Sequence, residues 1–421
     1  MSVPVLPVPR PAGPVDARRW PDVARPPHVS RARAAVAERI VRRAIRPLPL
    51  RVRLAGEREA AGAGGPLMEV RDPRAFFARI AAGGTIGFGE SYMAGEWDAP
   101  DLVGVLSAFA EHAATLVPRP LQRLRKVWAP AQPAGHRNTA DATRANISHH
   151  YDLSNDLFAL FLDDTLTYSS ALFRGFPAEQ HLLEAAQHRK IDRLLDLAET
   201  GPGTRLLEIG TGWGELAIRA AARGADVVTV TLSSEQQALA ARRVRDAGLD
   251  DRVTILLRDY RAITGTYDAV VSVEMIEAVG AEFWPEYFTA LGRLLVPGGH
   301  AALQAITMPH DRMLASRSTH TWIQKYIFPG GLLPSTEAIE ETAGRSGGLA
   351  VTARDTFGPH YAETLRLWRE RFTARAEEVG ALGFDETFRR MWTFYLAYSE
   401  AGFRSGYLDV QQLRLTKGTT A

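Results

Sequence analysis

The 421-residue chain contains no cysteine. This absence excludes disulfides, a thiol nucleophile, thiolate zinc sites and iron–sulfur clusters. No apolar run approaches the roughly 18 residues that span a bilayer, and residues 1–30 lack the uninterrupted apolar core of a secretory signal. The chain is 46% hydrophobic and 23% charged, which is typical of a folded globular protein and not of a disordered one. Its length predicts two domains.

Charge is distributed unevenly along the chain. Residues 1–55 contain twelve Arg and three acids and carry +9, so the remaining 366 residues carry −7 against an overall +2. A basic segment on an acidic body favours an anionic partner, which is a membrane lipid, a nucleic acid or the protein's own body. A solvated arginine-rich tail would have the same composition, so both interpretations stay open here.

Proline and periodicity divide the N-terminal part. Eight prolines without hydrophobic periodicity predict a disordered arm over residues 1–30. Residues 30–46 predict a basic amphipathic helix, ended by Pro47, that either lies on an anionic membrane or docks on its own domain. An accessory domain for lipid, membrane or dimer contact is predicted over 31–135. Within it, residues 71–83 predict a helix, and GFGESYMAGEWD (87–98) is interpreted as glycine-punctuated turns.

The rest of the chain, 136–421, is predicted to be the catalytic domain, after a proline-rich linker between 118 and 133. Strands are predicted over 204–209, 226–232, 253–257, 267–273 and 300–306, and helices over 215–222, 235–247 and 283–294. Strands that are apolar on both faces and alternate with helices predict an α/β, doubly wound parallel sheet. Ligands bind such sheets at the carboxyl ends of the strands.

The first of these strands ends in a glycine-rich turn that opens a helix. The turn reads Glu208-Ile-Gly210-Thr-Gly212-Trp-Gly214, which is G-x-G-x-G and not the dinucleotide fingerprint G-x-G-x-x-G. Its glycines allow the backbone to approach a ligand, and the acid before them favours a cationic or zwitterionic cofactor such as S-adenosylmethionine (SAM). A purely structural turn would look the same.

Polar residues follow the next two strands. Thr231 precedes Ser233 and Gln236, which either cap the next helix or face a ribose. Asp259 and Tyr260 are predicted to offer a carboxylate and an aromatic face to an adenine. All of these positions lie at the carboxyl edge of the predicted sheet.

Two acids follow the fourth strand. Glu274 and Glu277 are three residues apart in an apolar stretch, and we expect them on one face of a helix. Unpaired acids are costly to bury, and acids with perturbed pKa values cluster at active sites, so the pattern favours a functional role.

Apolar segments flank these motifs. Phe158, Phe161 and Leu162 predict core or the wall of an apolar tunnel, and the aromatic insertion at 322–331 predicts a lid over an apolar substrate. The neighbouring His149 and His150 would diverge on a helix, so we predict no metal site.

Together these segments resemble the cyclopropane-fatty-acyl-phospholipid synthase family, which includes the mycolic acid cyclopropane synthases. HYDLSNDLFALFLD, TYSSALF, LLEIGTGWGELAIRAA, VTLSSEQ, EMIEAVG, WIQKYIFPGG and GYLDV occur in the family's order and spacing over about residues 145–415. The chain resembles most the actinobacterial branch that makes 10-methylene and 10-methylstearic (tuberculostearic) acyl chains. The resemblance implies a SAM-dependent methyltransferase with a Rossmann-like sheet, lid insertions and a smaller N-terminal domain.

The resemblance also implies site residues. It places SAM against Tyr168, Ser169, Gly210, Gly212, Thr231, Gln236, Asp259 and Tyr260, to which the turn adds Glu208 and Gly214. Family members hold a bicarbonate ion as general base with a Cys, a Glu, a His, an Ile amide and a Tyr. The matching residues here are Ser170, Glu277, Gln304, Ile306 and Tyr361. Ser for Cys and Gln for His depart from the family, which predicts a weakened bicarbonate site.

The implied reaction is SAM-dependent methyl transfer to the cis double bond of an oleoyl-type phospholipid chain, through a carbocation, to a 10-methylene product. The alternatives are cyclopropane formation on the same substrate, a non-catalytic lipid-binding homologue, and methylation of a small amine or hydroxyl. The expected partner is unsaturated phospholipid at the membrane surface and not nucleic acid, with a homodimer and a reductase for a methylene product as further candidates. We expect a cytoplasmic protein peripheral to the inner face of the plasma membrane, to which the basic N-terminal segment is attracted.

Overall fold

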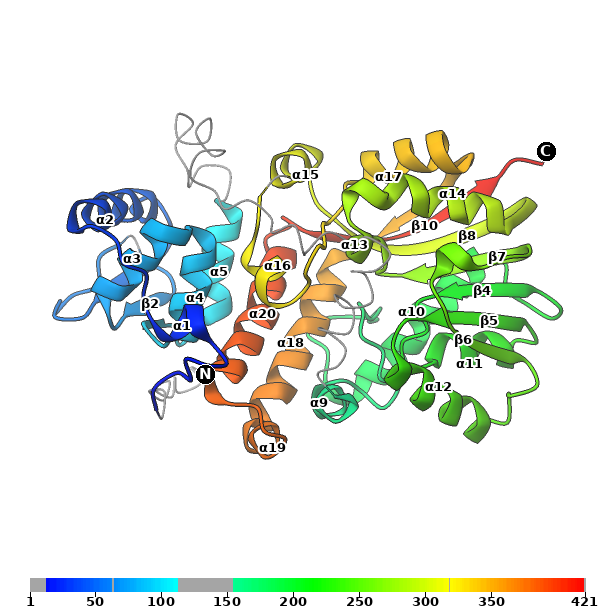
Figure 1. Ribbon diagram of the computed structural model, residues 1–421, viewed down its shortest axis with the longest axis horizontal. Coiled ribbons are helices and arrows are strands. Elements are labelled where there is room, and N and C mark those ends of the chain that lie inside the picture. The colour runs from blue at the N-terminus through cyan, green and yellow to red at the C-terminus, as the bar shows by residue number, and fades with distance from the viewer. Residues whose placement is uncertain (1–12, 63, 113–153, 318, 420–421) are drawn as a thin grey trace. The chain divides into compact units, whose positions relative to one another are not determined.

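The computed structural model describes residues 13–62, 64–112, 154–317 and 319–419 (Figure 1). The chain forms two compact units. The N-terminal unit comprises residues 1–132 together with 319–327 and 372–407. The sheet unit comprises residues 133–318, 328–371 and 408–421. The predicted boundary near residue 135, the proline-rich linker, His149 and His150 lie outside the described residues.

The sheet unit is built on a seven-stranded sheet in the order β6-β5-β4-β7-β8-β10-β9. Neighbours from β6 to β8 are parallel, whereas β10 is antiparallel to both β8 and β9. The strands are β4 (Arg205–Ile209), β5 (Asp226–Thr231), β6 (Val253–Leu257), β7 (Tyr267–Val273), β8 (Leu295–Thr307), β9 (Leu349–Thr356) and β10 (Asp409–Lys417). The helices are α9 (Asn155–Phe161), α10 (Leu183–Leu197), α11 (Glu215–Ala222), α12 (Ser234–Asp246), α13 (Ile276–Val279), α14 (Trp284–Leu294), α15 (His310–Ser316), α17 (Thr336–Thr342) and α18 (Gly358–Ala374).

Helices cover both faces of this sheet (Figure 1). Successive strand residues point to opposite faces, so Leu207 and Val270 pack with α14 and α17, whereas Leu206 and Val271 pack with α10 and α11. This arrangement confirms the predicted doubly wound α/β fold. The five predicted strands are present, but β9 and β10 were not predicted, because their alternating polar residues lack the continuous apolar run of the parallel strands.

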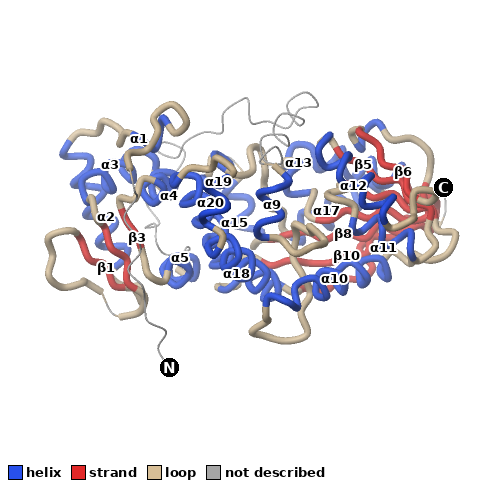
Figure 2. The backbone as a smooth tube through the Cα atoms, turned by 90° about the horizontal axis from the view of Figure 1, so that it is seen from below, coloured by secondary structure: helices blue, strands red, loops and turns tan. Residues whose placement is uncertain are grey.

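The N-terminal unit combines a small sheet with helices (Figure 2). In this sheet β1 pairs with β2 in parallel and β2 pairs with β3 antiparallel. The strands are β1 (Arg51–Leu54), β2 (Leu67–Val70) and β3 (Trp97–Asp98), and the helices are α1 (Pro21–Ala24), α2 (Arg31–Ile45), α3 (Pro73–Gly83), α4 (Thr85–Met93), α5 (Leu102–Glu111), α16 (Trp322–Tyr326), α19 (Ala376–Ala381) and α20 (Glu386–Arg404). The predicted basic helix is α2, and it packs on its own domain, where Arg33 Nη2 donates to the Ala81 carbonyl at 2.7 Å.

Three sequence-based expectations need correction in this unit. Residues 87–93 are helical, not turns, because the glycines of α4 allow close packing: a Cβ on Gly89 would lie 2.4 Å from the Trp322 ring. The arm predicted over 1–30 is folded at α1, where Val23 is buried. The segment 322–326, predicted as part of a lid, packs as α16 within this unit, and Tyr326 donates to Glu90 at 2.8 Å.

Arg79 is the charged centre of the N-terminal unit. Its side chain is 1% exposed, and its Nε donates to both carboxylate oxygens of Glu96 at 2.8 and 3.0 Å. Its terminal nitrogens donate to the carbonyls of Asp22 and Val23 at 2.7 and 2.5 Å, which ties α1 to α3. Burial raises the pKa of Glu96 to about 7 despite this partner.

No described helix has both the length and the apolar character needed to cross a bilayer.

We predict that Arg79→Met lowers the free energy of unfolding by about 3–5 kcal/mol, because it leaves a buried carboxylate and two carbonyls unpaired. Urea unfolding measures this loss. The matched control is Arg345→Met, which removes an exposed pair with Glu341 and should cost less than about 1 kcal/mol. Equal losses of unfolding free energy in the two variants would contradict the role of Arg79 as the buried partner of Glu96 and the two carbonyls.

Candidate active site

The glycine turn after β4 leads directly into α11. Gly210, Gly212 and Gly214 have φ values of 101°, 51° and 92°, a region that favours glycine. A Cβ on Gly210 would also lie 2.9 Å from the Met275 side chain. The turn therefore brings bare backbone and the first amides of α11 to the carboxyl edge of the sheet, where they fit a bound cofactor.

Buried charge lies directly behind this turn. Glu208, on β4, is 3% exposed and accepts a hydrogen bond from Thr229 Oγ1 at 2.6 Å, and burial raises its pKa to about 8. Lys190, on α10, is 1% exposed and donates to Ser169 Oγ at 2.6 Å, and burial lowers its pKa to about 8. The sequence analysis did not single out Lys190. Its place in the buried stripe of α10, beside Ile191 and Leu194, was the available signal.

The residues after β5 and β6 are engaged with their neighbours. Thr231 Oγ1 donates to Gln236 Oε1 at 2.8 Å, and Ser233 accepts from the Gln236 amide at 3.2 Å as the cap of α12. The carboxylate of Asp259 is held by Arg261 at 2.6 Å. The Tyr260 ring packs edge-on against Tyr287 at 5.6 Å between centroids. The capping interpretation of Ser233 is therefore correct.

Glu274, after β7, is the centre of a hydrogen-bond cluster. Its Oε1 accepts from the Ser170 amide at 3.0 Å and from Gln304 Nε2 at 2.8 Å, and its Oε2 accepts from the Tyr361 hydroxyl at 2.6 Å. These donors come from the segment after α9, from β8 and from α18. Burial raises the pKa of Glu274, and the three donors oppose that rise. Glu274 as a whole residue is partly exposed, whereas Ser170 and Gln304 are buried.

Glu277, on α13, binds a different donor. Its Oε1 accepts from the Ile306 amide, and its buried Oε2 has no hydrogen-bond partner among the described residues. Burial, and then the neighbouring charge of Glu274, raise its pKa to about 8. Glu274 does not share the helix with Glu277 as predicted: it precedes α13 with a φ of 51°.

Aromatic rings form a wall beside this cluster. Phe158 and Trp368 are fully buried, and both contact Tyr168, with ring centroids 5.2 and 5.3 Å apart. Trp368 also meets Tyr361 edge-on at 6.2 Å. Phe161 joins the same cluster, as the sequence analysis predicted for core or a tunnel wall. Tyr361 connects this apolar wall to Glu274, because its ring contacts Trp368 and its hydroxyl donates to the Glu274 carboxylate.

The structure thus brings together the five residues predicted to hold an anion, but around the chain's own carboxylates. Ser170, Gln304 and Tyr361 converge on Glu274, and Ile306 binds Glu277. The weakened bicarbonate site implied by the resemblance stays a prediction, and the four donors expected for it bind Glu274 or Glu277 in this structure. The sequence analysis favoured a functional role for Glu274 and Glu277 as a pair. It assigned a specific role to Glu277 alone, because only Glu277 matches a bicarbonate ligand of the family.

Comparisons with known proteins identify the family. A family model of mycolic acid cyclopropane synthetase matches residues 138–413. The chain belongs to this family. Tuberculostearic acid methyltransferase UfaA1 of Mycobacterium tuberculosis is 55% identical over 416 residues, 97% of this chain and 97% of the relative. The cyclopropane-fatty-acyl-phospholipid synthase of Escherichia coli is 36% identical over 360 residues, 83% of this chain and 88% of the relative.

A solved structure extends the comparison to the cofactor. The mycolic acid cyclopropane synthase CmaA1, complexed with SAH and CTAB, is similar with a TM-score of 0.59 and 33% identity, over 68% of this chain and 99% of that chain. The predicted family, fold and cofactor are confirmed: this chain is a SAM-dependent methyltransferase of the cyclopropane synthase family.

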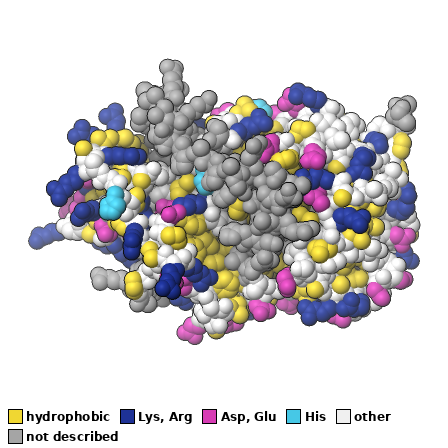
Figure 3. Space-filling model, in the orientation of Figure 1, with side chains coloured by type: hydrophobic (Ala, Val, Ile, Leu, Met, Phe, Trp, Pro, Cys, Tyr) yellow, Lys and Arg dark blue, Asp and Glu magenta, His cyan; other side chains and the backbone are white. Residues whose placement is uncertain are grey.

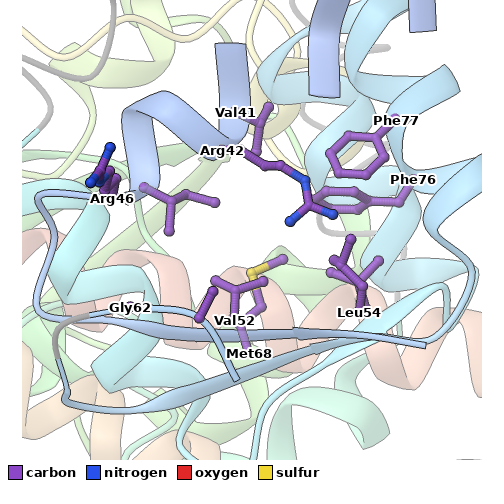
Figure 4. A pocket seen from close by; sticks show the side chains of 12 residues that line it. Val41, Arg42, Arg46, Val52, Leu54, Gly62, Met68, Phe76 and Phe77 are labelled. Carbon is purple, nitrogen blue, oxygen red and sulfur yellow. The ribbon is translucent and has the colours of Figure 1, made fainter. Parts of the chain in front are cut away.

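A concavity lies in the N-terminal unit (Figure 4). Its apolar lining comes from β1, β2 and α3 and includes Val52, Met68 and Phe76. Arg42 of α2 and Arg46, the residue after that helix, lie at its edge, and Arg42 extends across it toward Phe76 (Figure 4). Arg42 is paired with Glu38 and Glu57, at 2.9 and 3.2 Å.

We predict that Gly210→Ala weakens SAM binding about tenfold or more, because a side chain there requires a left-handed backbone and displaces Met275. Calorimetric titration measures the affinity. Gly248→Ala is the matched control. Gly248 has a φ of 67° and open space where a Cβ would lie, so this variant strains the backbone in the same way but leaves the glycine turn unchanged. Equal SAM affinity in the two variants would contradict a cofactor role for the turn.

Proposed function

We propose that this enzyme transfers the methyl group of SAM to the cis double bond of an oleoyl-type phospholipid chain and releases a 10-methylene branched chain. The observation that carries the proposal is the pair Glu274 and Glu277 beside an aromatic wall. An alkene is apolar and is itself the nucleophile, so its methylation needs no activated side chain. It needs an apolar channel and a group that takes up a proton.

Bound SAM supplies an electrophilic sulfonium methyl group. The residues of the turn, with Tyr168, Ser169, Thr231, Gln236, Asp259 and Tyr260, are proposed to hold it. Attack by the double bond leaves a cation on the neighbouring carbon of the acyl chain. The wall of Phe158, Tyr168 and Trp368 excludes water that would trap this cation, and aromatic faces attract positive charge. A buried carboxylate stabilises the cation and then accepts the proton.

The fate of the cation decides the product. A hydride shift to the first cationic carbon, followed by loss of a proton from the new methyl group, gives an exocyclic methylene. Loss of that proton without the shift closes a cyclopropane ring, which is the second candidate. The 55% identity to a tuberculostearic acid methyltransferase favours the methylene route, because a methylene becomes a methyl branch on addition of two hydrogens. A separate reductase is the proposed partner for that step.

The product assay tests this function. We predict that incubation with SAM and oleoyl phospholipid gives a C19 acyl chain with an exocyclic methylene, identified by mass spectrometry and proton NMR of the released esters. Stearoyl phospholipid is the matched control and should not react, because it has no double bond. A purely cyclopropane product would contradict the methylene proposal and leave the methyl transfer to the alkene intact.

We further propose that the N-terminal unit brings the enzyme to anionic phospholipid at the inner face of the membrane. All eight arginines between residues 31 and 53 are exposed, and basic side chains are frequent over the N-terminal unit in Figure 3. Val36 and Ile40 of α2 are also exposed, at 58% and 38%. Exposed apolar side chains among arginines fit a bilayer surface, where each nearby basic residue contributes about 1 kcal/mol.

We predict that Arg39→Glu with Arg43→Glu weakens binding to phosphatidylserine-containing liposomes at low salt by at least about 25-fold, since two attractions of about 1 kcal/mol each are lost. Liposome sedimentation measures the binding, and we expect the affinity for SAM to be unchanged. Arg242→Glu with Arg245→Glu, at two exposed positions of α12, is the control for the same change in net charge. Equal weakening by this control would contradict a membrane surface on α2.

A further inference from the structure

We propose that the carboxylate of Glu274 replaces the bicarbonate ion of the family, so that this enzyme carries its general base within its own chain. The inference rests on the proposed function and names the group that takes up the proton.

The donor set leaves no room for a free anion. The resemblance assigns bicarbonate to Ser170, Gln304, Tyr361, the Ile306 amide and Glu277. The first three donate to Glu274 at 3.0, 2.8 and 2.6 Å, and the Ile306 amide donates to Glu277. A bicarbonate ion would have to displace carboxylates from their donors and would add a negative charge beside them. The residues present therefore do not fit the ion.

A donor chain fixes the orientation of Gln304. An arginine can only donate, and Arg193 Nε donates to Gln412 Oε1 at 2.7 Å. Gln412 Nε2 must then donate to Gln304 Oε1, at 3.0 Å, which leaves Gln304 Nε2 to donate to Glu274. An imidazole at this position could lose its proton, whereas the amide always presents N–H. Gln304, a departure from the family, thus suits a carboxylate that is part of the chain.

The backbone also supports this assignment. Glu274 has a φ of 51°, a left-handed conformation that strains any residue with a side chain. Its amide is held by the Gln304 carbonyl at 2.8 Å. The same backbone geometry would accept glycine without strain, so removing the side chain should leave the turn intact.

Glu274 and Glu277 have different roles in this proposal. Glu274 is the less buried of the two residues, and the three donors on its carboxylate stabilise the ionised form against the rise in pKa that burial causes. Glu277 is buried with one oxygen unpartnered, which favours the protonated form. After the hydride shift, Glu274 takes a proton from the methyl group, and the C–H electron pair becomes the new C=C bond. The proton then passes to solvent, so the step needs no other reactant.

The experiment compares turnover with and without bicarbonate. Wild-type enzyme, SAM and oleoyl phospholipid are mixed in CO2-free buffer, with sodium bicarbonate or sodium chloride added at equal pH and ionic strength. We expect the wild-type rate to change by less than about twofold. Glu274→Gln should lower kcat about 10²- to 10³-fold with SAM affinity retained, because the amide cannot accept the proton. Glu274→Gly should be equally slow in chloride and recover at least about tenfold in bicarbonate.

A second readout does not depend on turnover. Bicarbonate should raise the melting temperature of Glu274→Gly but not of the wild type, because only a vacated site binds the ion. Glu341→Gln, on the exposed face of α17, is the control and should match the wild type in every arm. A wild-type enzyme that stops in CO2-free buffer and recovers with bicarbonate would overturn the inference, as would Glu274→Gln with normal kcat.

The outcomes also separate this inference from the proposed function. If the wild type methylates no lipid in either buffer, the proposed function fails. The melting temperatures still decide the inference in that case: stabilisation of the wild type by bicarbonate contradicts it, and stabilisation of Glu274→Gly alone supports it.

Discussion

The proposed active site depends on the burial of negative charge at the carboxyl edge of the sheet. Carboxylates in apolar surroundings are stable only where donors converge on them. Here the donors come from segments far apart in the chain: the Ser170 amide, Gln304 on β8, and Tyr361 on α18 all reach Glu274. Any change that moves one of these segments also moves the carboxylate. The position of the proposed catalytic carboxylate therefore depends on the packing of the whole sheet unit.

The same constraint explains the unusual polar residues inside the sheet. Gln304 and Gln412 are 1% and 0% exposed and face each other across the β8–β10 pair. Buried amides are costly unless each group is paired. Arg193, Lys190 and Glu274 complete their hydrogen bonds, so the pair is satisfied and its direction is fixed from the arginine. Antiparallel β10 is what places Gln412 opposite Gln304.

Much of the sheet unit could be predicted from the sequence. The strands from β4 to β8 carry continuous apolar runs, and the motif at 208–214 marks the edge where we propose that SAM binds. The role of Glu274 could not be predicted, because its donors are brought together only by β8, α18 and the segment after α9. The helix α4 was missed because its glycines are conventional turn residues. Their presence is explained by distant packing: the Arg79 carbonyl lies against Gly87 and the Trp322 ring against Gly89. Prediction from local sequence patterns fails where a residue type is required by packing against a segment far away in the chain.

The N-terminal unit is discontinuous in the chain, since it includes residues 319–327 and 372–407. Trp97, in β3, packs against Phe394 of α20, almost three hundred residues later. During synthesis, the first 132 residues must therefore wait for most of the remaining chain before their aromatic core can close. The sheet unit, although encoded later, has its parallel strands complete by residue 307. Strand β10 (Asp409–Lys417), which lies between β8 and β9, is made later still, so neither unit is complete until nearly the whole chain has been synthesised.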